Sequence, residues 1–125
     1  MANNQESYPL ISNGTHIIID VSEINNNEPL KYLNTVTLIL DKIVEKFSLN
    51  VVAKALHQFE PFGVTGVYVL SESHLSIHTF VEEQKVAIDL YTCNSFNIKE
   101  NVDIGDFIKS LFDNNCNIKY SIINR

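Results

Sequence analysis

The fold of this chain is decided by two neighbouring segments, Leu70-Ser71-Glu72-Ser73-His74-Leu75-Ser76-Ile77-His78-Thr79 and Ala87-Ile88-Asp89-Leu90-Tyr91-Thr92-Cys93. Polar and apolar residues alternate in much of both, which is typical of strands with two different faces. The polar residues 82–85 between them are typical of a hairpin loop. We therefore expect two strands, at 74–81 and 86–93, paired as an antiparallel hairpin.

Each of these strands is expected to carry its polar residues on one face. This face carries His74, Ser76 and His78 in the first strand, and Asp89, Tyr91 and Cys93 together with the small Ala87 in the second. Like faces must meet, because a slip of one residue would set apolar against polar side chains. One register that satisfies this pairs His78 with Asp89 and His74 with Cys93. It predicts a continuous polar face, with Ser73 at its edge.

Outward from the hairpin, the sequence predicts further strands at 16–21, 51–59, 64–71 and 118–123 and helices at 30–47 and 104–113. Apolar residues recur every three or four positions from Leu33 to Phe47, as on one face of an amphipathic helix. The strand at 64–71 is apolar on both faces, with Val67 and Val69 on one and Leu70 on the other, as expected of a strand covered on both sides. The order predicts an α+β fold, a two-layer sandwich with helices on one face of a mainly antiparallel sheet.

Length and composition fit one domain and exclude several partners. With 125 residues, 45% of them hydrophobic, the chain has material for a single core, which we place at residues 14–125 after a flexible segment 1–13. A net charge of −6 with nine scattered Lys and Arg argues against nucleic-acid binding. Two cysteines are too few for a disulfide framework, and no secretory signal or membrane span is recognisable. We expect a cytoplasmic protein without a membrane partner.

The chemistry is expected at the peptide bond between Glu72 and Ser73. A serine hydroxyl can attack the preceding carbonyl when a base takes its proton and hydrogen bonds favour the tetrahedral intermediate. Elimination and hydrolysis then leave a pyruvoyl group, a ketone that withdraws electrons much as pyridoxal phosphate does. Taken alone, Ser73, His78 or Cys93 would more often be structural. No metal site is expected, since His74 and His78 lie roughly 13 Å apart along a strand.

The joint pattern resembles the prokaryotic-type S-adenosylmethionine decarboxylases, whose motif is close to Ser-Glu-Ser-His-(Leu/Ile)-(Thr/Ser)-Ile-His-(Thr/Ser) and then Asp-(Leu/Val)-(Phe/Tyr)-Thr-Cys. The resemblance covers residues 57–94 at high quality. It implies self-cleavage between Glu72 and Ser73, a pyruvoyl group made from Ser73 without an external cofactor, and active sites at a homodimer interface. By the same resemblance, His78 accepts a proton in processing and Cys93 protonates the substrate carbon after decarboxylation.

Three further positions follow from the resemblance. Phe59 matches an aromatic residue that stacks on adenine, Glu82 matches a substrate-pocket glutamate, and Thr65 stands where a serine supports processing. Val81 replaces the usual proline, and Asn94 replaces a glycine. Asp89 either orients an imidazole or is an ordinary polar strand residue.

The implied reaction is decarboxylation of S-adenosylmethionine, which supplies the aminopropyl donor for spermidine synthesis. Two alternatives stay open at this point. One is a pyruvoyl enzyme that acts on arginine or ornithine, since loop shape decides what a pocket accepts. The other is an unprocessed regulatory paralogue, against which the intact Ser73, His78 and Cys93 weigh.

Overall fold

The computed structural model describes residues 14–93 and 103–125, so the expected flexible segment 1–13 and Asn94 lie outside the described residues. The elements are β1 (Thr15–Ser22), the 3₁₀ turn η2 (Glu28–Leu30), α1 (Leu33–Lys46), β2 (Val51–Gln58), β3 (Val64–Leu70), β4 (Ser73–Phe80), β5 (Lys85–Thr92), α3 (Ile104–Leu111) and β6 (Asn117–Asn124). Every predicted strand and helix is present in the predicted order. Most boundaries differ by one or two residues.

The first helix begins at Leu33, three residues later than expected. Pro29 lies in η2, and Tyr32 follows it with an extended backbone (φ −125°, ψ 152°) that interrupts the helical run. The Thr35 hydroxyl donates to the Pro29 and Tyr32 carbonyls at 2.7 and 3.0 Å, which ties the turn to the start of α1.

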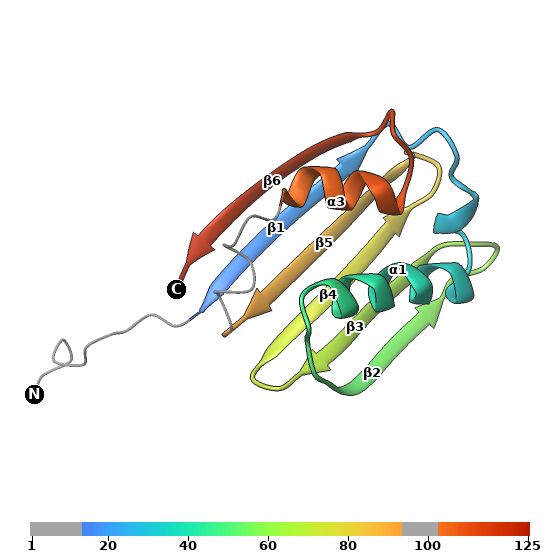
Figure 1. The fold of residues 1–125 in the computed structure, drawn as a ribbon. Coiled ribbons are helices and arrows are strands. Elements are labelled where there is room, and N and C mark those ends of the chain that lie inside the picture. Colours follow the sequence, from blue (N-terminus) through green and yellow to red (C-terminus); the bar gives the residue numbers. More distant parts are fainter. Residues whose placement is uncertain (1–13, 94–102) are drawn as a thin grey trace, which may run out of the picture.

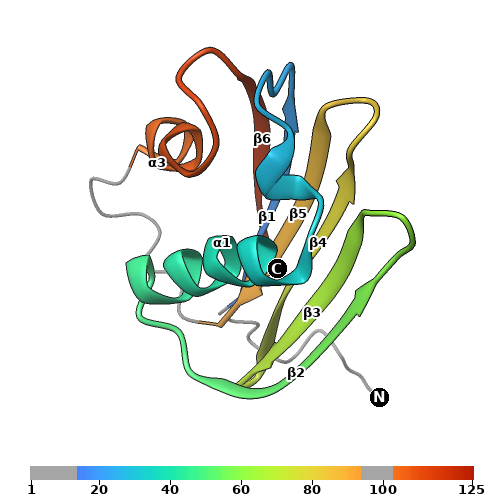
Figure 2. The same cartoon turned by 90° about the vertical axis from the view of Figure 1, so that its right-hand side faces the viewer.

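The strands form one six-stranded sheet in the order β2-β3-β4-β5-β1-β6, and all of its pairings are antiparallel (Figure 1). Figure 2 shows α1 and α3 on the same side of the sheet. The fold is therefore the expected two-layer α+β sandwich. No helix in the described parts of the chain is long and apolar enough to cross a membrane.

The core lies between the sheet and the two helices. Its fully buried side chains include Ile17, Val36, Leu40, Tyr68, Leu75, Ile77, Ile88, Leu90 and Ile108. Burial alternates along each central strand, so every second side chain contributes to this core. The Tyr68 hydroxyl donates to Asp41 of α1 at 2.7 Å, and burial, with this hydrogen bond, raises the pKa of Tyr68 above its usual value.

The opposite face of the sheet is not covered by any described helix. On β3 it carries Thr65, Val67 and Val69, and Val69 is 45% exposed. The prediction that β3 is covered on both faces is therefore wrong for the single chain, because both helices pack on one side. The apolar residues of this open face have no cover within the described structure.

The predicted register of the β4–β5 hairpin is also wrong, by two residues. His78 lies opposite Ala87 rather than Asp89, and His74 lies opposite Tyr91 rather than Cys93. The turn sets this register: Gln84 donates its N–H to the Val81 carbonyl at 3.0 Å and has a left-handed φ of 56°. A shift of two preserves the faces, so the polar side chains still share the open face.

Candidate active site

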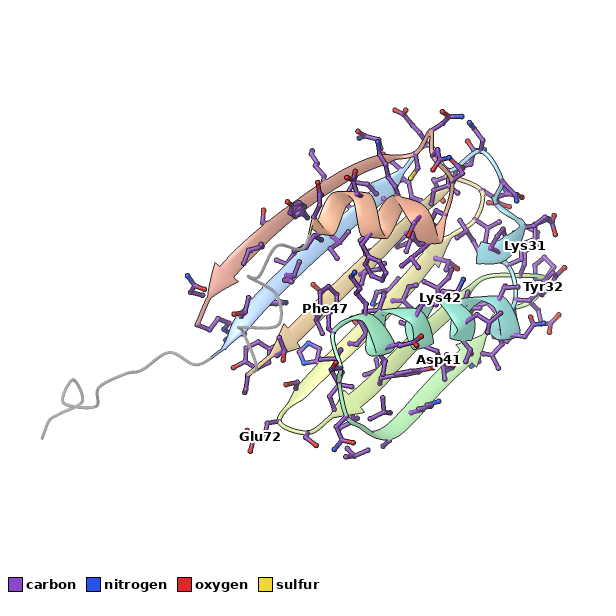
Figure 3. All side chains as sticks on the ribbon, viewed as in Figure 1. Lys31, Tyr32, Asp41, Lys42, Phe47 and Glu72 are labelled. Atoms are coloured by element: carbon purple, nitrogen blue, oxygen red, sulfur yellow. The ribbon has the colours of Figure 1, made fainter. Side chains whose placement is uncertain are left out.

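The predicted cleavage bond lies at the tip of the β3–β4 hairpin. Leu70 pairs with Ser73, so Ser71 and Glu72 alone form the turn. Glu72 has a φ of 62°, and its side chain projects from the tip (Figure 3). Ser73 is the first residue of β4. The bond after Glu72 therefore joins a tight turn to a strand.

Cys93 contacts both sides of this bond. Its backbone N–H donates to Ser73 Oγ at 3.2 Å, and its thiol donates to the Glu72 carbonyl oxygen at 3.2 Å. These contacts exist because β5 ends beside the start of β4, where His74 pairs with Tyr91. Two predicted site residues that are far apart in sequence thus meet at one peptide bond.

A pocket of about 380 Å³ opens beside the same bond. Its lining combines the end of the α1–β2 loop with the hairpin and the end of β5, through Ser48, Leu49, Asn50, Leu70, Ser71, Glu72, Ser73, Thr92 and Cys93. Ser73 and Cys93 are therefore reachable from solvent. We call this region, with Glu72, Ser73 and Cys93, the cleavage end.

The second group of predicted residues lies at the other end of β4. Thr65 of β3 pairs with His78, and the Thr65 hydroxyl lies 3.3 Å from His78 Nδ1, within hydrogen-bond distance. Beyond them a pocket of about 270 Å³ is lined by Phe59, Pro61, Phe62, Gly63, Thr79, Phe80, Val81, Glu82 and Glu83. Phe59 is 47% exposed, so its ring is available for stacking. We call this region, with Phe59, Thr65, His78 and Glu82, the histidine end.

The cleavage end and the histidine end do not meet within one chain. His78 follows Ser73 by five residues on one strand, which corresponds to roughly 17 Å. A general base must lie within about 3 Å of the atom whose proton it takes. The imidazole of His78 therefore cannot serve Ser73 of the same chain in this arrangement.

Between the two ends, the open face carries a polar cluster that the sequence predicted only in part. Asp89 Oδ1 lies 3.4 Å from His16 Nε2, a buried nitrogen that has no hydrogen-bond partner among the described residues. The imidazole beside Asp89 is thus His16 of β1, not His78. The rings of His16, His74 and Tyr91 lie 6.0 to 6.2 Å apart. Sequence reasoning missed His16, since no local pattern shows that β1 pairs with β5.

Comparison with models of known protein families identifies the family of this chain. The model of the family described as S-adenosylmethionine decarboxylase matches residues 15–124, which includes both ends of the site. The chain belongs to the S-adenosylmethionine decarboxylase family. The resemblance read from the motif is thereby confirmed.

Relatives in this family are named S-adenosylmethionine decarboxylase proenzyme. That of Thermodesulfovibrio yellowstonii is 41% identical over 80 residues, 64% of this chain and 58% of its own length. That of Symbiobacterium thermophilum is 46% identical over 83 residues (64% and 60%), and that of Clostridium botulinum strain Loch Maree is 36% identical over 81 residues (65% and 69%). The alignments thus span about three fifths to two thirds of these relatives. None of the three is named for arginine or ornithine.

The fold has a solved counterpart in the adenosylmethionine decarboxylase from Aquifex aeolicus. The TM-score is 0.75 at 24% sequence identity, and the match covers 91% of each chain. This likeness confirms the predicted α+β fold.

Proposed function

We propose that this chain cleaves itself between Glu72 and Ser73 and then decarboxylates S-adenosylmethionine with the pyruvoyl group made from Ser73. The observation that carries the proposal is the double contact of Cys93 with Ser73 Oγ and with the Glu72 carbonyl oxygen. The proenzyme names of the relatives support it, because a proenzyme requires processing.

The cleavage starts when Ser73 Oγ attacks the Glu72 carbonyl carbon. The new C–O bond forms, the C–N bond breaks, and the hydroxyl proton ends on the freed amine, which gives an ester. Loss of the Ser73 α-proton then breaks the Cβ–Oγ bond and releases Glu72 as a carboxylate. One water hydrolyses the remaining enamine through its imine form, releases ammonia and leaves the pyruvoyl group.

Two groups of Cys93 assist the first step. The Cys93 N–H fixes the position of Ser73 Oγ, and the thiol donates to the oxygen on which negative charge develops. Hydrogen bonds to that oxygen stabilise the negatively charged transition state more than they stabilise the neutral amide. The residues of the cleavage end thus fit the formation of a pyruvoyl group from Ser73.

The proton acceptor comes from a second copy of the chain. In such a homodimer, the two sheets would pack by their open faces, about 10 Å apart, around a twofold axis perpendicular to the strands. This axis would make β4 of one copy run antiparallel to β4 of the other. The cleavage end of one copy would then lie opposite the histidine end of the other. Ser76, midway between Ser73 and His78 on β4, would lie near such an axis. The uncovered apolar residues of the open face, such as Ile18 and Val69, support this packing.

The homodimer also completes the substrate site. Phe59 would stack on the adenine and Glu82 would bind the same substrate from the pocket of the histidine end. The pyruvoyl group would supply a ketone that condenses with the substrate amine and draws electrons as the carboxylate leaves. Cys93 then returns a proton to the substrate carbon, and its place beside Ser73 supports this role. The product is the aminopropyl donor for spermidine synthesis.

The test combines cleavage with turnover. We expect freshly made chain to split after Glu72, the Ser73→Ala chain to stay whole, and the split form to release carbon dioxide from S-adenosylmethionine. Release from arginine or ornithine instead would refute the substrate. A wild-type chain that stays whole and releases nothing would leave only a regulatory role.

A further inference from the structure

The turn that joins β3 to β4 has a backbone conformation that its own sequence does not favour. Glu72 has a φ of 62°, in the left-handed region that residues with a Cβ rarely adopt. Ser71 is not among the positive-φ residues, so only the second turn position is left-handed. Two-residue hairpins favour positive φ at the first position or at both, with Gly or Asn. Contacts from outside the turn must therefore maintain the strained conformation of Glu72.

Asn50, the residue before β2, holds this turn by two hydrogen bonds. The Ser71 N–H donates to the Asn50 carbonyl at 3.0 Å, and Asn50 Nδ2 donates to Ser71 Oγ at 2.7 Å. Both bonds fix the residue that directly precedes Glu72.

The loop that carries Asn50 is itself fastened to α1. The Ser48 N–H donates to the Glu45 carbonyl at 3.2 Å, and the Leu49 N–H donates to the Val44 carbonyl at 3.0 Å. The turn is thus anchored to the helix layer on one side of Glu72. On the other side, Cys93 holds the Glu72 carbonyl oxygen and Ser73 Oγ. The predicted cleavage bond lies between two fixed points.

We propose that Asn50 is a positioning residue for self-cleavage, which acts through Ser71 to maintain the strained conformation of Glu72 in the uncleaved chain. This inference rests on the proposed function. When Ser73 Oγ displaces the amide nitrogen, the link from the Glu72 carbonyl carbon to Ser73 Cα lengthens by one atom, because Oγ and Cβ replace N. The longer link relaxes the turn, so the strain favours the ester over the amide.

The first test removes the side-chain bond. Full-length Asn50→Ala chain is made by cell-free translation, and its cleavage is followed by intact mass at timed points. We expect cleavage about tenfold slower than in the wild type, which corresponds to about 1.4 kcal/mol in the barrier. The matched control is Asn117→Ala, which removes another Asn–Ser side-chain bond, from Asn117 Nδ2 to Ser22 Oγ at 3.4 Å, and should cleave at the wild-type rate.

The outcomes separate the inference from the proposed function. Wild-type cleavage rates in a folded Asn50→Ala chain would overturn the role of Asn50. If Asn50→Ala does not fold by thermal melting, Ser71→Ala removes the same bond from its other end and carries the same expectation. A wild-type chain that never cleaves would instead refute the proposed function itself.

A second test asks whether Asn50 acts through strain. Glycine adopts a left-handed φ freely, so Glu72→Gly should slow cleavage by itself but add little in the Asn50→Ala background. Hydroxylamine cleaves esters and so reports how much ester forms before elimination. We expect it to cleave the Asn50→Ala chain more slowly than the wild type by the same factor. Fully additive slowing in the double variant, or equal hydroxylamine cleavage, would contradict positioning through Glu72.

Discussion

Cleavage should be restored when two variants that fail for different reasons share one dimer. Ser73→Ala lacks the nucleophile but keeps the histidine end, and His78→Ala keeps the nucleophile but lacks the base. Within one chain these groups lie roughly 17 Å apart along β4, five to six times the reach of a hydrogen bond. Each variant made alone should therefore stay whole, whereas a mixed dimer contains one complete site.

The expected fraction of cleaved chains follows from random pairing of the two variants. At equal amounts, half of the His78→Ala chains meet a Ser73→Ala chain, so about half of them should be cleaved and no Ser73→Ala chain should be. The assay is cell-free co-translation of the two variants, with one chain carrying a mass tag, followed by intact mass under denaturing conditions. Translation of the variants in separate tubes is the control.

The refuting result is equally direct. If the His78→Ala chain stays whole in the mixture while the wild type cleaves under the same conditions, His78 does not act across a dimer. If His78→Ala cleaves by itself at the wild-type rate, His78 is not the proton acceptor at all.

Three further predictions concern the open face, the substrate pocket and the core. Val67→Arg places a charge opposite Ser76 on the uncovered face. The variant should fold, sediment as a monomer in analytical ultracentrifugation and no longer cleave. A monomer that still cleaves would contradict the shared site. Phe59→Ala should leave cleavage intact and raise KM for S-adenosylmethionine about tenfold through lost stacking, and an unchanged KM would remove Phe59 from the pocket. Tyr68→Phe should lower the free energy of unfolding at pH 7 by about 1 kcal/mol, since it deletes the bond to Asp41. Because the folded chain raises the pKa of Tyr68, its contribution is present below the unfolded value near pH 10 and is lost above it. Denaturant titrations should therefore show wild type losing more stability than Tyr68→Phe between pH 10 and about pH 11.

The element order and the faces could be predicted from sequence because they follow from local periodicity. Every second residue of β4 and β5 faces the core, and this parity is visible without a structure. The register could not be predicted in the same way, since registers that differ by two residues preserve parity. The conformation of Gln84 in the turn decides between them.

The contacts among the candidate site residues could be predicted only in part. The motif predicts Ser73, Cys93 and His78 as site residues, and the strand rise already separates His78 from Ser73. The contacts of Cys93 with Ser73 and Glu72 could not be predicted, since they depend on the register of β4 with β5. The contact of Asp89 with His16 depends on the pairing of β1 with β5, which joins segments far apart in the chain. The anchor at Asn50 was beyond prediction for a related reason, because the left-handed Glu72 shows no glycine or asparagine signal.

The most direct measurement of the central claim is the intact mass of freshly made full-length chain under denaturing conditions. Self-cleavage predicts two fragments, residues 1–72 and residues 73–125, the second blocked to amino-terminal sequencing by its pyruvoyl group. A single species of all 125 residues with serine still at position 73 would contradict it.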